Sequence, residues 1–321
     1  MRVLTGLRDV ERRPRAVAIG TFDGVHAGHR AVIGEAVARG REHGLTTAVL
    51  TFDRHPLALL DRARQPRLLT TADEKRRLIA ELGPDELILL AFDTTLAALG
   101  PDDFCTDILH DALSARLVVV GANFTFGAGG AGDAGALRRC GERLGFEAVA
   151  LRLVTEDGRP ISSTRIRLLL HEGRLEDVRA ILGRPPSAAG RVVPGDRRGR
   201  TLGMPTANVD VEAGTLFPGK GVYVARVRVA GRWFRAAVNV GHNPTFHDRD
   251  EPTTHVTVEA HLLGFEGDIY ARDIRVDFLH KLRDERRFES VDALVAQMRA
   301  DVSAAAALDD PALDEVGLGG A

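Results

Sequence analysis

The chain has 321 residues, of which 44% are hydrophobic and 27% charged, and its formal net charge is −2. This length predicts two domains, and the balanced charge excludes the basic field that draws proteins onto nucleic acid. No apolar run approaches the roughly 18 residues of a membrane-spanning helix, and the N-terminus lacks the apolar stretch of a secretory signal. We therefore expect a cytoplasmic protein that acts on neither nucleic acid nor membranes.

Strand-like and helix-like segments alternate along the first half of the chain. Apolar runs predict five strands, at residues 15–20, 46–52, 86–92, 116–124 and 147–154. Helices are predicted over 29–44 and 70–83, the second with a capping box of Thr71 and Glu74, and another opens at Gly100. This alternation predicts an α/β domain whose parallel sheet is covered by helices on both faces.

The pattern changes near Gly183, after which the runs are short, strand-like and broken by Gly, Pro and Asn. Residues 221–241 predict a hairpin that turns at Ala230 and Gly231, and residues 254–263 alternate between apolar and polar side chains. We expect a small antiparallel β-barrel closed by a helix over 290–302. We predict an α/β domain at 1–185, a barrel domain at 186–304 and a flexible tail at 305–321.

Two smaller expectations concern side chains outside the motifs. Cys105 and Cys140 fit no metal or disulfide spacing and lie on the apolar sides of predicted helices, so we expect buried free thiols. Lys220 and Arg226 are expected to be surface charges.

The stretch GTFDGVHAGH, from Gly20 to His29, directly follows the strand predicted at 15–20. In open parallel sheets ligands bind beyond the carboxyl ends of the strands, and glycines at a helix N-terminus suit a phosphate. His26 and His29 would lie on one side of that helix and could donate hydrogen bonds to phosphate oxygens. Two alternatives stay open: a metal site completed by Asp23 or His55, and a purely structural pair.

Two later segments bear on the same site. GAGGAG at 127–132 satisfies the GxGxxG pattern of dinucleotide folds, but it follows the fourth strand and lacks the acidic partner, so we interpret it as a loop near the nucleotide. ISSTRIR at 161–167 reads as a helix start, where Ser163 and Thr164 can cap free N–H groups and Arg167 can reach a triphosphate.

A second candidate site lies in the barrel half. Residues 191–210 combine Gly195, Gly199 and Gly203 with Thr206 and Asn208. Backbone N–H groups of such a loop can cradle phosphates, and hydroxyl and amide oxygens suit Mg²⁺. Without further evidence, a plain tight turn is the alternative for this segment.

Glu259 lies on the polar face of its strand and is the candidate general base. A metal site of His255, Glu259 and His261, or a solvated strand face, remains an alternative.

These motifs resemble those of bacterial flavin nucleotidylyltransferases, which form the first half of bifunctional riboflavin kinase/FAD synthetases. The resemblance spans about residues 16–302 and rests on these segments: GTFDGVHAGH, TFDRHP at 51–56, GANFTFG at 121–127, ISSTRIR, PTAN at 205–208, 239–246 and 258–272. The family often has Asp where this chain has Asn123.

The resemblance implies a Rossmann-like nucleotidylyltransferase domain, a riboflavin kinase barrel, Mg²⁺ as cofactor, and ATP, riboflavin, FMN and FAD as small-molecule partners. His26 and His29 would stabilise charge at the α-phosphate without a covalent intermediate, and Glu259 would activate the riboflavin hydroxyl. The resemblance also implies ATP and phosphate contacts from Gly20, Phe22, Asp23, Gly24, Gly28, Ser163, Thr164, Arg167, Gly195 and Gly203; flavin contacts from Asn123, Phe126 and Phe104; and magnesium contacts from Thr206 and Asn208.

Two rival functions fit less of the sequence. A nucleotidylyltransferase for a phosphopantetheine-like or nicotinate-type substrate would account for the GTFDGVHAGH segment but would give the PTAN region no function. A non-catalytic flavin or nucleotide sensor predicts loss of His26, Thr206 or Glu259, and all three are present. Self-association stays open.

Overall fold

The computed structural model describes residues 1–195, 203–212, 214–243 and 255–313. The chain divides into two compact units, Met1–Ser163 and Thr164–Ala321. The helices α7 (Ser163–Glu172) and α8 (Leu175–Leu182) are thereby grouped almost entirely with the second unit. The functional boundary drawn after residue 185 stays a prediction.

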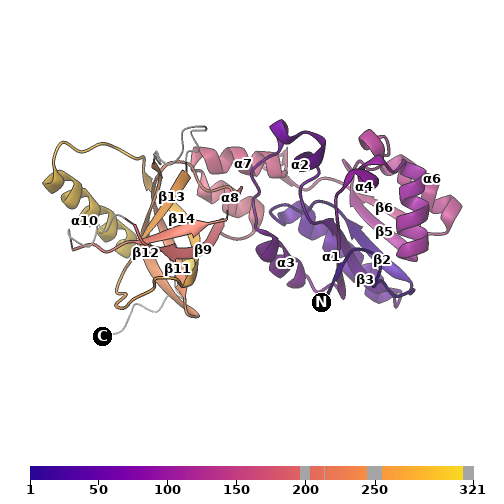
Figure 1. The fold of residues 1–321 in the computed structure, drawn as a ribbon, viewed down its shortest axis with the longest axis horizontal. Coiled ribbons are helices and arrows are strands. Elements are labelled where there is room, and N and C mark those ends of the chain that lie inside the picture. The colour runs from indigo at the N-terminus through magenta and orange to yellow at the C-terminus, as the bar shows by residue number, and fades with distance from the viewer. Residues whose placement is uncertain (196–202, 213, 244–254, 314–321) are drawn as a thin grey trace. The chain divides into compact units, whose positions relative to one another are not determined.

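The first unit is built on one parallel sheet (Figure 1). Its strands are β1 (Arg2–Thr5), β2 (Arg15–Ile19), β3 (Thr46–Phe52), β4 (Glu86–Leu90), β5 (Ala115–Gly121) and β6 (Glu147–Leu151). Their order in the sheet is β1-β4-β3-β2-β5-β6. The chain runs from β2 outward through β3 and β4, then crosses to β5 on the other side of β2. The strand order therefore reverses beside β2, which is where open α/β sheets bind ligands.

Helices cover both faces of this sheet, as predicted. They are α1 (Ala27–Glu42), α2 (Leu57–Leu60), α3 (Ala72–Ala80), α4 (Thr94–Ala98), α5 (Pro101–Asp103), a π-helix (Phe104–Ala112) and α6 (Ala134–Leu144), with 3₁₀ turns at Arg62–Arg64 and Ala128–Gly130 and a small hairpin of β7 (Thr155–Glu156) and β8 (Arg159–Pro160). Thr71 caps α3, since its hydroxyl accepts the Glu74 N–H at 3.2 Å. Alternate strand residues enter two separate hydrophobic clusters, one under α1 and α3 and the other under the π-helix and α6.

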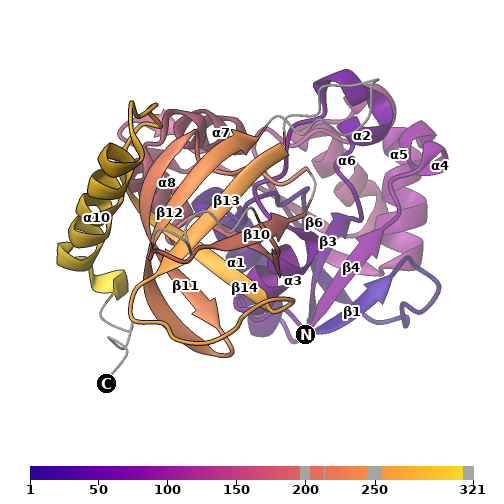
Figure 2. The same ribbon diagram turned by 60° about the vertical axis from the view of Figure 1, so that its left-hand side comes forward.

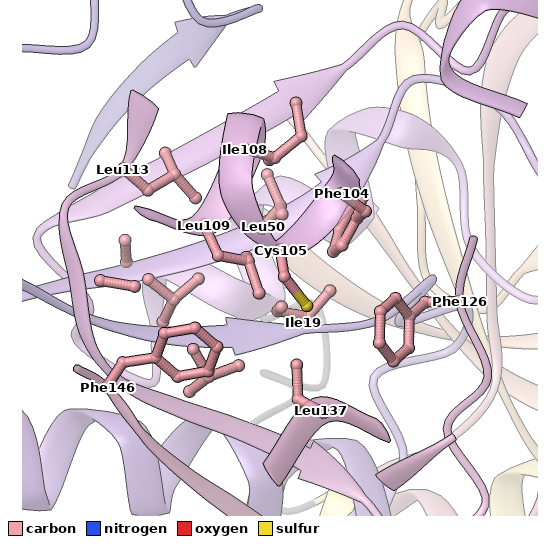
Figure 3. Close-up of a cluster of buried hydrophobic side chains, with 14 of the residues drawn as sticks. Ile19, Leu50, Phe104, Cys105, Ile108, Leu109, Leu113, Phe126, Leu137 and Phe146 are labelled. Carbon is pink, nitrogen blue, oxygen red and sulfur yellow. The ribbon is translucent and has the colours of Figure 1, made fainter. Parts of the chain in front are cut away.

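Figure 3 shows the cluster under the π-helix, where Phe104, Cys105 and Phe126 point toward Ile19 and Leu50. Cys105 and Cys140 are both buried and free, which confirms the prediction. Burial raises the pKa of the Cys105 thiol well above its ordinary value, and the neighbouring Cys140 raises it further.

A buried ion pair lies at the opposite, amino-terminal edge of the sheet. Arg15 begins β2 with no exposed surface, and its Nε donates to Glu86 Oε2 on β4 at 2.8 Å. Its remaining donors reach the main-chain oxygens of Leu113, Arg13 and Glu11. Because Arg15 is hydrogen-bonded on all sides, it fixes the strand starts without leaving a buried charge unpaired.

The second unit contains a closed antiparallel barrel (Figure 2). Its strands are β9 (Ser187–Val193), β10 (Ala207–Val211), β11 (Gly221–Val229), β12 (Arg232–Asn243), β13 (His255–Leu262) and β14 (Asp273–Arg283), in the cyclic order β10-β13-β12-β11-β14-β9. The predicted hairpin is confirmed, with Ala230 at φ 46° and Gly231 at φ 85° in the turn between β11 and β12. The alternation predicted for β13 also holds, since Val258, Ala260 and Leu262 are buried.

Helix α10 (Val291–Ala307) and a 3₁₀ turn (Pro311–Leu313) close the barrel unit, and here one prediction is wrong. The chain does not become a tail at residue 305, because the Arg235 guanidinium binds the carbonyls of Ala306 and Leu308 and the Leu313 side chain is buried.

Two further differences have simple causes. Strand β1 was not predicted because it is a short edge strand with mostly exposed residues, and it pairs in parallel with β4. Arg226 is not a surface charge: its Nε donates to the buried Asp277 at 3.0 Å and its guanidinium lies 4.4 Å from the Trp233 ring centre.

Every helix in the described part of the chain is too short or too polar to span a bilayer.

Candidate active sites

The GTFDGVHAGH segment forms the loop between β2 and α1 at the carboxyl edge of the sheet. His26 is the N-cap of α1, with its backbone extended, and its Nδ1 accepts the His29 N–H at 3.3 Å. The loop is held from β3, because the Thr51 hydroxyl donates to the Thr21 carbonyl at 3.2 Å. The first turn of α1 is thus fixed beside the point where the strand order reverses.

The two histidines lie on the same side of the helix, as their spacing predicts. Their rings stack with centroids 3.6 Å apart and an angle of 20° between planes, and the Phe22 ring meets His29 edge-on at 5.4 Å. Burial lowers the pKa of His29 well below its usual value, and the neighbouring His26 and Lys75 lower it further. The buried His29 Nδ1 has no hydrogen-bond partner among the described residues. A neutral imidazole here keeps one N–H to donate.

A cavity of about 470 Å³ opens in front of this pair, within the size range of small-molecule sites. The predicted site residues that line it are Gly20, Phe22, His26, Gly28, His29, Phe104, Asn123, Phe126 and Ser163. The structure therefore brings together residues from the loops after β2 and β5, from the π-helix and from the start of α7.

Asp23 and Gly24 do not line the cavity. The Asp23 carboxylate accepts the Leu69 N–H at 2.9 Å, and the Gly24 N–H donates to the Thr70 hydroxyl at 3.2 Å. Gly24 has φ 84°, and an added Cβ would lie 2.8 Å from the Leu69 side chain. Both residues hold the loop in place, and their contact with phosphate stays a prediction. His55, the other suggested metal partner, accepts the Leu57 N–H at 3.2 Å.

Aromatic side chains form much of the cavity wall. Phe104 and Phe126 belong to the hydrophobic core and are only 5% and 7% exposed. Phe124 was not predicted as a site residue, yet it also lines the cavity, is half-buried and stacks on Phe126 with 5.6 Å between centroids. Phe124 therefore presents more surface to a planar ligand than either predicted aromatic residue.

The GAGGAG segment borders the same cavity through Gly127, Gly129 and Gly130, all with positive φ. Hydrogen bonds between Phe126 and Gly132 close the loop at its base. This is a closed loop after β5, and not the strand-to-helix turn of a dinucleotide fold.

The ISSTRIR segment begins α7. The Ser163 hydroxyl donates to the Asp23 carbonyl at 3.0 Å. This bond ties Ser163 to the loop of residues 20–29 that carries His26 and His29, which we call the histidine loop. Thr164 and Arg167 follow on the same helix, and their phosphate roles stay predictions.

The second site lies at one end of the barrel, where β9 ends and β10 begins. Gly195, Thr206 and Asn208 line a cavity of about 570 Å³ together with Phe265 and Tyr270. Gly195 lies directly against Asn208, because an added Cβ would be 2.2 Å from Asn208 Nδ2. Gly203, at φ 74°, is described but does not line this cavity, whereas Gly199 falls outside the described residues.

Glu259 sits next to this cavity by strand register. It is paired with Asn208 on β10 and with Asn239 on β12, so three polar residues form one row across neighbouring strands. Directly opposed residues have Cβ atoms about 5 Å apart. Asn239 was not predicted as a site residue, since only the register of the hairpins places it beside Glu259.

The described residues do not complete either of the two alternative metal sites, at His26 and His29 or at Glu259 and His261. His261 Nδ1 lies 2.8 Å from the Pro205 carbonyl, and the His255 side chain falls outside the described part of the structure. Within the described ranges no group of three or more His, Cys, Asp and Glu side chains is arranged to hold a metal.

Comparison with known proteins agrees with this two-site architecture. The FAD synthetase family matches residues 9–165 and the Riboflavin kinase family matches residues 182–308. The bifunctional riboflavin kinase/FMN adenylyltransferase of Escherichia coli K12 is 37% identical over 94% of this chain and 96% of its own length. The protein of the same name from Bacillus subtilis is 34% identical over 91% of both chains.

A solved structure described as a macrolide-efflux protein from Streptococcus pneumoniae has a TM-score of 0.86 and 31% identity, covering 96% of this chain and 100% of that one. On the extent and identity of the matched sequence, this chain belongs to the bifunctional riboflavin kinase/FMN adenylyltransferase family.

Proposed function

We propose that this chain makes FAD from riboflavin in two ATP-dependent steps. The barrel would move the γ-phosphoryl group of ATP to the ribityl 5′-hydroxyl, giving FMN and ADP. The α/β unit would then transfer AMP from a second ATP to the FMN phosphate, giving FAD and pyrophosphate. The observation that carries this proposal is the presence, in one chain, of the histidine loop at the reversal point of the sheet and the Asn208–Glu259 row on the barrel.

In the kinase step Glu259 is the general base. Its carboxylate takes the proton of the 5′-hydroxyl while that oxygen attacks the γ-phosphorus and the bond to ADP breaks. The residues next to it fit a magnesium ion, because the Thr206 hydroxyl and Asn208 amide supply hard oxygen donors on the cavity wall. When bound, the metal would neutralise charge on the transferred phosphoryl group. Gly195 and Gly203 would let the backbone approach the phosphates.

In the adenylylation step an FMN phosphate oxygen attacks the α-phosphorus of ATP in line with departing pyrophosphate. No enzyme nucleophile is required. His26 and His29 would donate hydrogen bonds to phosphate oxygens, with the free N–H groups in the first turn of α1 adding positive potential. Burial suits this role because it strengthens each hydrogen bond to the developing charge.

The remaining predicted residues would bind either the flavin or the triphosphate. Asn123, Phe126 and Phe104 would contact the flavin, and Phe124 joins them as the most exposed of the three rings. Thr164 and Arg167 would bind the triphosphate. The kinase and adenylyltransferase chemistry of the family implies ATP and a divalent metal, and because cells keep ATP in the cytoplasm we propose that the protein works there on small molecules alone.

The test is a chromatographic assay for FMN and FAD with riboflavin, ATP and Mg²⁺. His26→Ala should abolish FAD formation and spare FMN formation. Glu259→Ala should stop FMN formation yet still make FAD when FMN is supplied. If folded His26→Ala protein also fails to make FMN, the two-site proposal is wrong.

A fragment offers a second test of the same proposal. Residues from 186 onward, expressed alone, should phosphorylate riboflavin. A folded but inert fragment would contradict an independent kinase domain.

A further inference from the structure

The cavity in front of His26 and His29 carries almost no formal charge on its wall. The described residues that line it include no Asp, Glu or Lys, and one Arg, Arg152. The other polar side chains on this wall are neutral, and they are Thr21, Asn123, Thr125, Ser162 and Ser163. ATP and FMN, the two substrates proposed for this cavity, are both anions. Arg152 is therefore the permanently cationic side chain that the described wall offers to two phosphate-bearing ligands.

The other sources of positive potential at this cavity are weak or local. Burial lowers the pKa of His29 well below its usual value, so its ring adds no charge at neutral pH. The N-terminus of α1 is equivalent to about half a positive charge, and its effect falls off within the first turn. A phosphate monoester carries a charge of about −1.5 to −2 near neutral pH. The histidine loop can thus stabilise one phosphate, whereas the remaining phosphates need a further cation.

Arg152 is placed at the cavity by the pairing of β6 with β5. It directly follows β6, and both strands run parallel to β2, so their carboxyl ends share one edge of the sheet. The Ala122 N–H donates to the Leu151 carbonyl at 2.8 Å, which holds the chain just before Arg152 against the chain just before Asn123. Neighbouring strands are about 4.8 Å apart, so β6 lies roughly 10 Å from β2. Arg152 therefore borders the cavity from the β6 edge, and the histidine loop borders it from β2.

The guanidinium of Arg152 is available to a ligand. Arg152 is exposed, and among the described residues it has no hydrogen-bond or ion-pair partner. Arg116, at the start of β5, instead donates to the Gly145 carbonyl at 3.4 Å. Arginine presents a planar fork of N–H donors that matches the oxygens of a phosphate. Because no carboxylate or carbonyl of the described chain occupies this fork in Arg152, it can bind phosphate without first breaking an internal bond.

We propose that Arg152 is a substrate-binding residue for adenylyl transfer: its guanidinium binds a phosphate group in the cavity in front of His26 and His29. The inference rests on the proposed function and deepens it, since it names a contact that no motif assigns. Arg152 lies outside GANFTFG and ISSTRIR, the segments before and after it on which the family resemblance rests. The ligand chemistry is a phosphate oxygen, and ATP and FMN are its two sources.

The test compares Arg152→Gln, Arg152→Met and Arg152→Lys in the full-length chain. Gln keeps an N–H donor without the charge, Met removes both, and Lys keeps the charge without the planar fork. Arg116→Gln is the matched control, because it removes an exposed arginine from the neighbouring strand at a position that does not line the cavity. FMN formation from riboflavin reports, in every variant, that the rest of the chain is intact.

The readout is KM for ATP and KM for FMN in FAD formation. Arg152→Gln and Arg152→Met should raise one of these KM values roughly 10-fold, since a hydrogen bond to a charged group is lost. A rise for ATP assigns Arg152 to the triphosphate, and a rise for FMN assigns it to the FMN phosphate. Arg152→Lys should show a smaller rise, and Arg116→Gln none. The ratio of KM between Arg152→Gln and the wild type should shrink at high KCl concentration, because salt screens an exposed charge pair.

Unchanged KM values for both substrates in Arg152→Gln and Arg152→Met overturn the proposal. An equal rise in all three variants that does not depend on salt also overturns it, because it would show that the guanidinium packs on a ring and not on a phosphate. A wild-type chain that makes no FAD refutes the proposed function, and this inference falls with it. FAD formation by the wild type with unchanged KM values in the variants refutes the inference alone.

Discussion

The contact between Gly195 and Asn208 allows a sharp test of the kinase site. Replacing Gly195 by Ala adds a single methyl group whose Cβ would lie 2.2 Å from Asn208 Nδ2 and 2.5 Å from its Cγ. Ordinary contact begins near 3.4 Å, so the amide must move by about 1 Å or the loop must withdraw. The first response displaces one of the two oxygens proposed to hold magnesium, and the second moves a backbone segment proposed to contact phosphate.

The size of the effect follows from that displacement. A misplacement of about 1 Å in a reacting assembly costs roughly 10²-fold in rate, which corresponds to about 2.7 kcal/mol of transition-state stabilisation. We therefore expect kcat for FMN formation to fall roughly 10²-fold in Gly195→Ala. FAD formation from supplied FMN should be unchanged, because the residues that line the cavity in front of His26 and His29 belong to the other unit.

Two glycine variants serve as matched controls in the same coupled assay. Gly34→Ala adds a methyl group to α1 where nothing lies within 4 Å, and it should leave both activities intact. Gly28→Ala would put its Cβ 3.2 Å from the His26 ring, so it should slow FAD formation, by less than the 10²-fold above, and spare FMN formation. Wild-type FMN synthesis by folded Gly195→Ala protein would refute the assignment of Asn208 to the kinase site.

Three further predictions concern stability, each measured by urea unfolding. Truncation after residue 304 should destabilise the barrel unit by about 3 kcal/mol or more, because it exposes the contact surface of Leu313 and removes the carbonyls that bind Arg235; an unchanged midpoint would contradict this. Glu86→Gln should cost about 3–5 kcal/mol, since it leaves the buried Arg15 charge uncompensated; a cost below about 1 kcal/mol would show that Arg15 needs no partner. Burial alone would raise the pKa of Asp310, but the Ala312 N–H, His280 and Arg179 outweigh it and hold that pKa below its usual value. The contribution of ionised Asp310 to the free energy of unfolding is therefore complete above about pH 4 and is lost as the pH falls further. Asp310→Asn should lower the free energy of unfolding at neutral pH and make it fall less steeply at acidic pH. Parallel plots of unfolding free energy against pH for the two proteins would refute this linkage.

Much of the fold could be predicted because its signals are local. Apolar runs located β2 to β6, and a capping box located the start of α3. The pattern of residues 221–241, with its turn at Ala230 and Gly231, located the hairpin of β11 and β12. Strand β1 escaped because an exposed edge strand carries little apolar pattern. The end of the chain was misjudged because Ala-rich and acidic segments look disordered until Arg235 and His280 are seen to bind them.

The candidate sites were predictable only as far as their motifs extend. Spacing placed His26 and His29 on one side of α1, and alternation placed Glu259 on the polar face of β13. The alternation could not show that Glu259 is paired with Asn239, because the register between β12 and β13 depends on the whole barrel. Nor could spacing show that Phe124 is more exposed than Phe126, since both follow the same strand.

The loop of GTFDGVHAGH shows why a motif alone is an incomplete description of a site. Its Asp23 invites a phosphate or metal role, yet its carboxylate is bonded to Leu69 and its carbonyl to Ser163. Those partners lie 46 and 140 residues away from Asp23 in the sequence. The loop that carries the two histidines is therefore held in part by Leu69 and Thr70, whose segment carries no phosphate-binding pattern, and in part by the start of ISSTRIR.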